Sequence, residues 1–168
     1  MTVRPERPGD VAAIRRVNEA AFGRASEADL VDALRAHGRV SRSLVAERAG
    51  VIVGHILFSP VRIDSGRTST AAIGLAPMAV LPAHQRAGNG SLLVRTGLAE
   101  CRRAGHGCVV VLGHPEFYLR FGFVRASRHG LAWEHSAPDE AFMVLPLRED
   151  AIAAGGGVVR YAPEFGQV

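Results

Sequence analysis

The chain has 168 residues, of which 48% are apolar and 21% charged, and its formal net charge is +4. This size and composition are typical of one globular domain with its own hydrophobic core. The two cysteines, Cys101 and Cys108, exclude a disulfide scaffold and a cysteine-rich zinc module. No apolar run approaches the roughly 20 residues that a membrane span needs.

The basic residues are all arginine, and the sequence contains no lysine. Lysine Schiff-base chemistry and a P-loop are therefore excluded. The arginines are scattered and no aromatic residues interleave with them, so we expect no nucleic-acid partner despite a pI near 10.0. The first residues, MTVRPERPGD, lack the apolar run of a signal peptide, and the expected location is the cytoplasm.

The first half of the chain predicts two helices followed by strands. Apolar residues spaced by three and four indicate helices at 11–22 and 27–37, with Asp10 as the cap of the first. Strands are expected at 43–49, 51–59 and 70–80. Pro77 lacks an N–H group and cannot sit in a regular central ladder, so a bulge or gap is expected there.

The second half predicts a βαβ unit and then shorter elements. A helix at 89–104 is followed by a continuous apolar strand at 108–112, which indicates a strand covered on both faces and parallel to 70–80. The remaining expected elements are a short helix at 115–120, strands near 123–126 and 141–147, and an edge strand at 158–161.

The stretch 80–91 joins a predicted strand to a predicted helix and is rich in glycine. Gly88 and Gly90 let the backbone turn sharply and approach a ligand closely. The amides of 85–91, backed by the helix N-terminus, would form an anion-binding nest. An ordinary turn fits the same spacing equally well, whereas a dinucleotide-binding fold is disfavoured because two helices and several strands precede the loop.

The same stretch resembles the cofactor loop of the GCN5-related N-acetyltransferase (GNAT) superfamily, V-x-P-x-x-[QR]-x-x-G-x-[GA]. The matching residues are Val80, Pro82, Gln85, Gly88 and Gly90. Asn89 departs from the pattern, since the family usually has an aliphatic residue there. The segment 118–123, YLRFGF, is similar to a second family motif, and the phrase GHPEFY at 113–118 looks like a bacterial, YhbS-like branch.

The resemblance implies an α+β (α/β/α) fold with a mixed, mostly antiparallel sheet of six to seven strands. A parallel central pair would splay apart around acetyl-CoA, with no metal. We expect residues 1–147 to form the acetyltransferase domain and 148–168 a C-terminal extension packed on it. The resemblance assigns cofactor binding to Met78, Ala79, Val80, Gln85, Arg86, Ala87, Gly88, Asn89, Gly90 and Ser91.

Acetyl transfer to an amine requires a base for the amine, a donor for the oxyanion and a proton for the leaving thiolate. Tyr118 matches the family's general acid, and the backbone near 78–80 is the expected oxyanion donor. No acid stands on the strand 71–80, so His114 is the first candidate for the base and Glu116 the second. Both cysteines fit better as core residues than as nucleophiles, which favours direct transfer.

Two functions therefore stay open: an N-acetyltransferase, and a non-catalytic module that binds coenzyme A and serves regulation or interaction. The acceptor would be a small-molecule or peptide amine. It is expected to meet the first two helices, the strands near 54–63 and the segment 127–139, which contains Trp133. A homodimer that pairs through an exposed edge near the tail is compatible with the resemblance.

Overall fold

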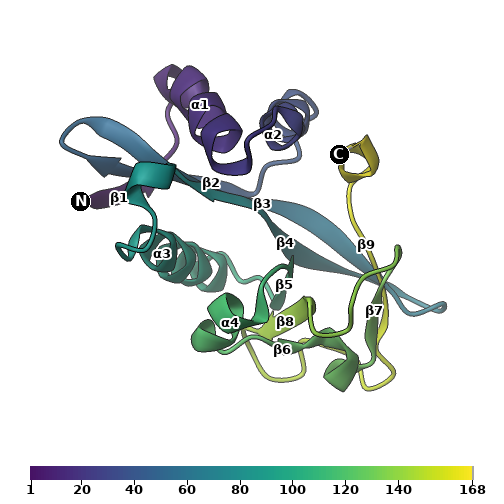
Figure 1. Cartoon of the computed structure of the whole chain (residues 1–168). Helices are drawn as coiled ribbons and strands as arrows, with labels where there is room; N and C mark the ends of the chain where they lie inside the picture. Colours follow the sequence, from purple (N-terminus) through teal and green to yellow (C-terminus); the bar gives the residue numbers. More distant parts are fainter. Residues whose placement is uncertain (168) are drawn as a thin grey trace.

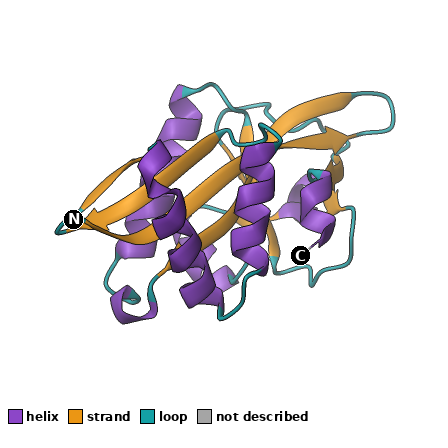
Figure 2. Ribbon diagram, turned by 90° about the horizontal axis from the view of Figure 1, so that it is seen from above, coloured by secondary structure: helices purple, strands orange, loops and turns teal. Residues whose placement is uncertain are grey.

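The computed structural model describes residues 1–167, which form two layers of helices around one sheet (Figure 1). Helices α1 and α2 lie on one face of the sheet, and α3 and the short α4 lie on the other. Seen from above, the helices lie across the strands (Figure 2). The helices are α1 (Val11–Phe22), α2 (Ser26–Ala36), α3 (Asn89–Arg103) and α4 (Pro115–Tyr118). The strands are β1 (Thr2–Pro5), β2 (Arg42–Arg48), β3 (Val51–Asp64), β4 (Ser69–Val80), β5 (Cys108–Leu112), β6 (Val124–Arg125), β7 (Leu131–Trp133), β8 (Phe142–Pro146) and β9 (Gly157–Arg160).

The sheet order is β1-β2-β3-β4-β5-β8-β6, and β9 pairs with β3 and with β7. Most pairs are antiparallel, and the central β4–β5 pair is parallel as expected from the βαβ unit. The predicted fold class is confirmed. Within residues 1–167 the sheet has nine strands, because β1 and β7 add to the seven strand ranges expected from the sequence.

The core follows the two-residue period of the strands. Ile56 and Phe58 of β3 pack on the α3 side, and Leu57 between them packs with α1 and α2. In β5, Val109 and Val111 join the α3 cluster while Val110 joins a third cluster beneath β9. This burial on both faces explains the continuous apolar run in the sequence.

The C-terminal strand differs from the expectation of an edge strand. β9 runs antiparallel to the end of β3 and parallel to β7, so it has a partner on each side. The chain that leads into β9 passes close to the chain that leads into β7, and this requires glycine at position 156. An added Cβ on Gly156 would stand 2.2 Å from the carbonyl oxygen of Gly130. The exposed edge invoked for a homodimer is therefore not at β9.

Asp10 precedes α1, but its side chain does not cap that helix. Its carboxylate instead accepts hydrogen bonds from the Arg4 guanidinium at 2.7 and 3.1 Å and from the Arg7 N–H at 2.7 Å. The Arg4 hydrogen bond holds the pKa of Asp10 below its usual value. The residue thus ties β1 to the start of α1.

A buried polar chain links α1 to β3 and β2. Asn18 Nδ2 lies 3.1 Å from His55 Nδ1, and His55 Nε2 lies 2.9 Å from Ser43 Oγ. The Ser43 hydroxyl donates to Glu6. Because Asn18 donates, Nδ1 accepts and the proton of neutral His55 sits on Nε2. His55 is fully buried, and this burial together with the Arg35 charge lowers its pKa to about 3.

The free energy of unfolding should therefore fall as the pH drops from about 6.5 to 5. In this window the unfolded chain binds a proton that the folded His55 does not, which costs about 1.4 kcal/mol of stability per pH unit. Burial also lowers the pKa of His106, so the comparison is made in a His106→Asn background. Urea unfolding of His106→Asn and of the double variant His55→Gln/His106→Asn at several pH values measures the slope. An unchanged slope in His55→Gln would contradict the assignment.

Among the described residues, no helix is long and apolar enough to cross a membrane.

Candidate acyl-transfer site

The parallel strands β4 and β5 separate after a short contact. They pair only at Ile73–Leu75 and Val109–Val111. Beyond Leu75, the strand β4 continues to Val80 with β3 on one side, and within residues 1–167 no strand pairs with its other side. The predicted splay of the central pair is therefore present, and it exposes backbone groups of β4.

Pro77 lies where the β3–β4 register shifts. Leu75 pairs with Phe58 and Met78 with Ile56, so two residues of β4 oppose one of β3. This bulge confirms the expectation from the sequence.

The backbone beyond the bulge offers donors to the open side. Leu81 donates its N–H to the Val53 carbonyl of β3 at 2.8 Å. Since backbone groups alternate sides along a strand, the N–H groups of Met78 and Val80 point away from β3. The Val80 carbonyl accepts a hydrogen bond from Gln85 Nε2 at 3.0 Å, which ties the following loop to the strand end.

The loop turns into α3 through two left-handed residues, Arg86 (φ 59°) and Gly88 (φ 82°). The first N–H groups of a helix have no acceptor within it, and no side chain caps α3. Asn89 is buried and donates from Nδ2 to the His84 carbonyl at 2.6 Å. This hydrogen bond shows how a polar residue replaces the family's aliphatic one: Asn89 braces the loop with its side chain and occupies none of the backbone N–H groups that follow Gln85.

The mouth of the loop is narrow and positively charged. A Cβ added at Gly90 would lie 3.4 Å from Met78 Cε and 3.5 Å from Phe117 Cζ, so a side chain there would enter the space between β4 and α4. Arg120 lies over the Phe117 ring at 4.9 Å and donates to Ser91 Oγ at 3.2 Å. Its guanidinium therefore stands beside the first turn of α3.

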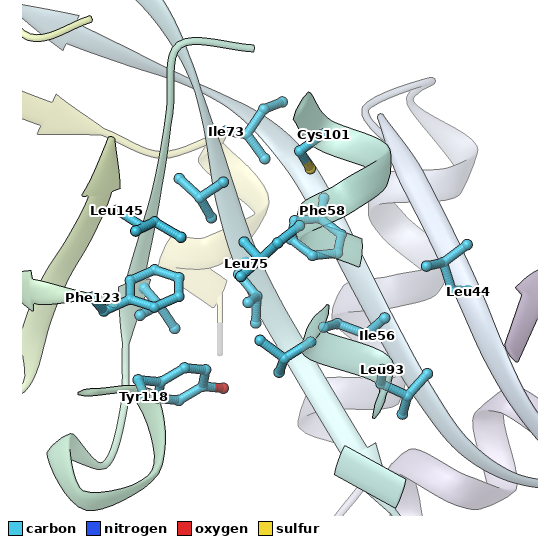
Figure 3. Packing of buried hydrophobic residues seen from close by; sticks show 14 of the residues in the cluster. Leu44, Ile56, Phe58, Ile73, Leu75, Leu93, Cys101, Tyr118, Phe123 and Leu145 are labelled. Carbon is cyan, nitrogen blue, oxygen red and sulfur yellow. The ribbon is translucent and has the colours of Figure 1, made fainter. Parts of the chain in front are cut away.

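Tyr118 is held by close packing at the start of the splay. The centroid of its ring lies 4.9 Å from that of Phe117 and 5.7 Å from that of Phe123, both in edge-to-face contact. A Cβ on Gly113 would stand 2.5 Å from Tyr118 Cε2, so only glycine leaves room for the ring. Figure 3 shows its hydroxyl directed away from Phe123 and toward the strand that carries Leu75. Burial raises the pKa of the phenol, which stays protonated at neutral pH.

The other proton-transfer candidates differ in their position. His114 is exposed and lines the cleft that the splay opens, whereas Glu116 is exposed and lies outside its lining. Cys101 and Cys108 are buried, and burial raises the pKa of each thiol to about 11. Neither thiol is a nucleophile at neutral pH.

The cleft has a volume of about 1100 Å³ and joins most of the predicted site. Its lining includes Met78, Ala79, Val80, Gln85, Arg86, Gly88, Gly90, Ser91, His114 and Tyr118. Of the other predicted residues, Ala87 is exposed on the loop and Asn89 is buried beneath it. The strands near 54–63 do not line the cleft, and from the segment 127–139 only Trp133 does.

Glu27 borders the cleft from α2, one of the two helices expected to meet the acceptor. Tyr161 and Phe165 near the C-terminus also line the cleft and were not foreseen. A turn-rich tail gives no periodic signal that it returns to a distant helix, so sequence reasoning had no means of finding these two aromatic residues. No group of three metal-ligating side chains is found in residues 1–167.

Comparison with known proteins gives one consistent result. The model of the acetyltransferase (GNAT) domain family matches residues 2–126. The uncharacterized N-acetyltransferase YhbS of Escherichia coli is 34% identical over 98% of both chains. A crystal structure of that protein in complex with CoA aligns over 98% of this chain and 91% of its own, with a TM-score of 0.92. A GNAT family acetyltransferase from Brucella melitensis in complex with acetyl-CoA is 41% identical, covers 98% and 97% of the two chains, and has a TM-score of 0.80.

The family model, the identity over nearly the whole chain and the shared fold agree with both sequence motifs. The chain is an N-acetyltransferase and belongs to the GNAT family.

Proposed function

We propose that this enzyme transfers the acetyl group of acetyl-CoA directly to a primary amine in the cleft between β4 and β5. The observation that carries the proposal is the unpaired side of β4, which leads from the amide nest at 85–91 to Tyr118. The YhbS and Brucella melitensis structures contain CoA and acetyl-CoA, respectively, which supports the choice of acyl donor.

The residues present fit this donor. The loop amides and Arg86 are suited to a diphosphate, because unpaired N–H groups at a helix N-terminus attract anions without a metal. The N–H groups of Met78 and Val80 would pair with the amide-bearing arm as a neighbouring strand would. Residues 148–168 are proposed to belong to the same domain, since β9 hydrogen-bonds to β3.

The chain's own groups account for the proton movements. Bound acetyl-CoA supplies a thioester whose carbonyl carbon the amine attacks. A backbone N–H at 78–80 stabilises the negative charge on the carbonyl oxygen. Tyr118 gives its phenolic proton to the departing sulfur, and His114 removes a proton from the amine.

Calorimetry with acetyl-CoA and an assay of thiol release over a panel of amines test the proposal together. Saturable binding with amine-dependent thiol release is expected. Tight binding without release for any amine would favour the non-catalytic module, for which the absence of an acid on β4 is the specific support. Absence of binding would refute the cofactor site itself.

Replacing His114 by glutamine should lower kcat/KM for the amine by about 100-fold at neutral pH, the lower end of the usual contribution of a general base. Glutamine keeps a polar side chain but has no nitrogen that can accept the proton. Glu116→Gln is the matched control and should behave as wild type. If His114→Gln kept the kcat/KM of wild type, the role of the base would pass to water.

A further inference from the structure

The end of the cleft opposite the loop 85–91 is walled by aromatic side chains that lie outside the matched family segment. Trp133 belongs to β7, and Tyr161 and Phe165 follow β9, whereas the family model ends at residue 126. The C-terminal segment is held against the end of α2, because Glu164 binds His37 at 2.9 Å and Arg39 at 3.2 Å. Figure 1 shows the final helical turn, Pro163–Gln167, beside α2. This wall is therefore a fixed part of the fold.

The aromatic rings stand nearly perpendicular to one another. Trp133 and Tyr161 have centroids 6.2 Å apart at 70°, and Tyr161 and Phe165 have centroids 4.9 Å apart at 85°. Because all three residues line the cleft, rings set at such angles can offer both faces and edges to a ligand there. Aromatic faces attract alkylammonium ions, and cages of this kind are a common way of binding them.

The only acidic side chain among the described cleft-lining residues is Glu27. It is 7% exposed, and both of its carboxylate oxygens lie 3.1 Å from Arg24 Nε. The Arg24 hydrogen bond keeps the pKa of Glu27 low, so the group is ionised at neutral pH. A carboxylate whose pKa is held low is a weak base, so it suits recognition of a cation better than removal of a proton.

Two polar atoms of the aromatic wall lack partners. The Tyr161 hydroxyl and the Trp133 Nε1 are buried, and neither has a hydrogen-bond partner in the described part of the chain. Leaving such groups unpaired is costly. The phenol oxygen can accept from an ammonium N–H, and the indole N–H can donate to an oxygen of the same ligand.

We propose that Glu27, Trp133, Tyr161 and Phe165 form the acceptor pocket, and that it takes a small free alkylammonium in preference to a lysine of a folded protein. The inference rests on the proposed acetyl transfer and names the substrate class of that site. Both the tethered C-terminal segment and the buried polar groups argue for a small ligand that enters the pocket completely.

Trp133 is the only tryptophan of the chain, so intrinsic fluorescence reports binding without turnover. The probe is propylammonium added to the protein in the absence and in the presence of CoA, with 1-propanol as the neutral analogue. A saturable change with propylammonium and none with 1-propanol is expected. Equal responses to both probes, or no saturable response to propylammonium, would overturn the proposal.

Two variants distinguish the effect of the Glu27 charge from a general effect on the folding of α2. Glu27→Gln should weaken propylammonium binding at least tenfold and raise the KM for the amine, while acetyl-CoA binding stays unchanged. Asp29→Asn is the matched control on the same helix, because its carboxylate is 64% exposed and pairs with Arg15 outside the cleft. Wild-type affinity in Glu27→Gln would refute the role of the carboxylate.

Different results would refute the proposed acceptor and the proposed acyl donor. Loss of acetyl-CoA binding in wild type would refute the proposed function and leave the fluorescence result standing. Acetylation of a lysine in a folded protein at a higher kcat/KM than that for propylamine would refute the pocket's preference and leave acetyl transfer intact.

Discussion

Replacing Tyr118 by phenylalanine is expected to lower kcat by about 100- to 10,000-fold, the range found for loss of a positioned general acid. The variant removes only the hydroxyl, and the ring keeps its contacts with Phe117 and Phe123. A thiol has an ordinary pKa of about 8.5, so a sulfur that leaves at neutral pH gains from a nearby proton donor. Because burial raises the pKa of Tyr118, the donor stays protonated through this range.

Steady-state thiol release, read together with calorimetric binding of acetyl-CoA, separates catalysis from packing. Affinity for acetyl-CoA should stay within a few-fold of wild type while kcat falls. Full turnover in the variant would remove the acid role from Tyr118. A parallel loss of affinity and thermal stability would instead identify the hydroxyl as a structural group.

Replacing Gly90 by aspartate is expected to weaken acetyl-CoA binding at least about 100-fold, or roughly 2.7 kcal/mol. The new carboxylate would stand in the first turn of α3, where it competes with a diphosphate for the same N–H groups. The fold should tolerate the change, since an acid in the first turn stabilises a helix. The added Cβ meets Met78 and Phe117 at ordinary contact distances.

Gly90→Asn is the matched control because it has the same size and no charge. It should lose much less affinity than Gly90→Asp, and the difference between the two measures repulsion of the diphosphate. Equal affinities of the aspartate and asparagine variants in a calorimetric titration would contradict the placement of the diphosphate at this loop.

The motif at 80–91 and the segment 118–123 were informative because their chemistry is local. A glycine that turns a strand into a helix and a tyrosine one turn after a buried strand are set by neighbours in sequence. The same holds for the bulge at Pro77, since a residue without an N–H interrupts a ladder wherever it lies.

The capping role expected for Asp10 failed because other donors take its carboxylate. The Arg4 guanidinium, six residues earlier on β1, donates two N–H groups to it, and the Arg7 N–H donates a third. Paired guanidinium hydrogen bonds are among the strong ones, and the carboxylate makes no bond to α1.

The sequence by itself determined the family, the parallel unit and the loop that would hold the donor, because periodicity, glycine geometry and motif spacing act over short stretches. Only the tertiary structure decided which side chains line the cleft together with that loop. Glu27, Trp133 and Tyr161 are far apart along the chain and meet because β9 pairs with β3 and carries the tail back to α2. Contacts between distant segments depend on how the whole sheet packs, and no local pattern encodes them.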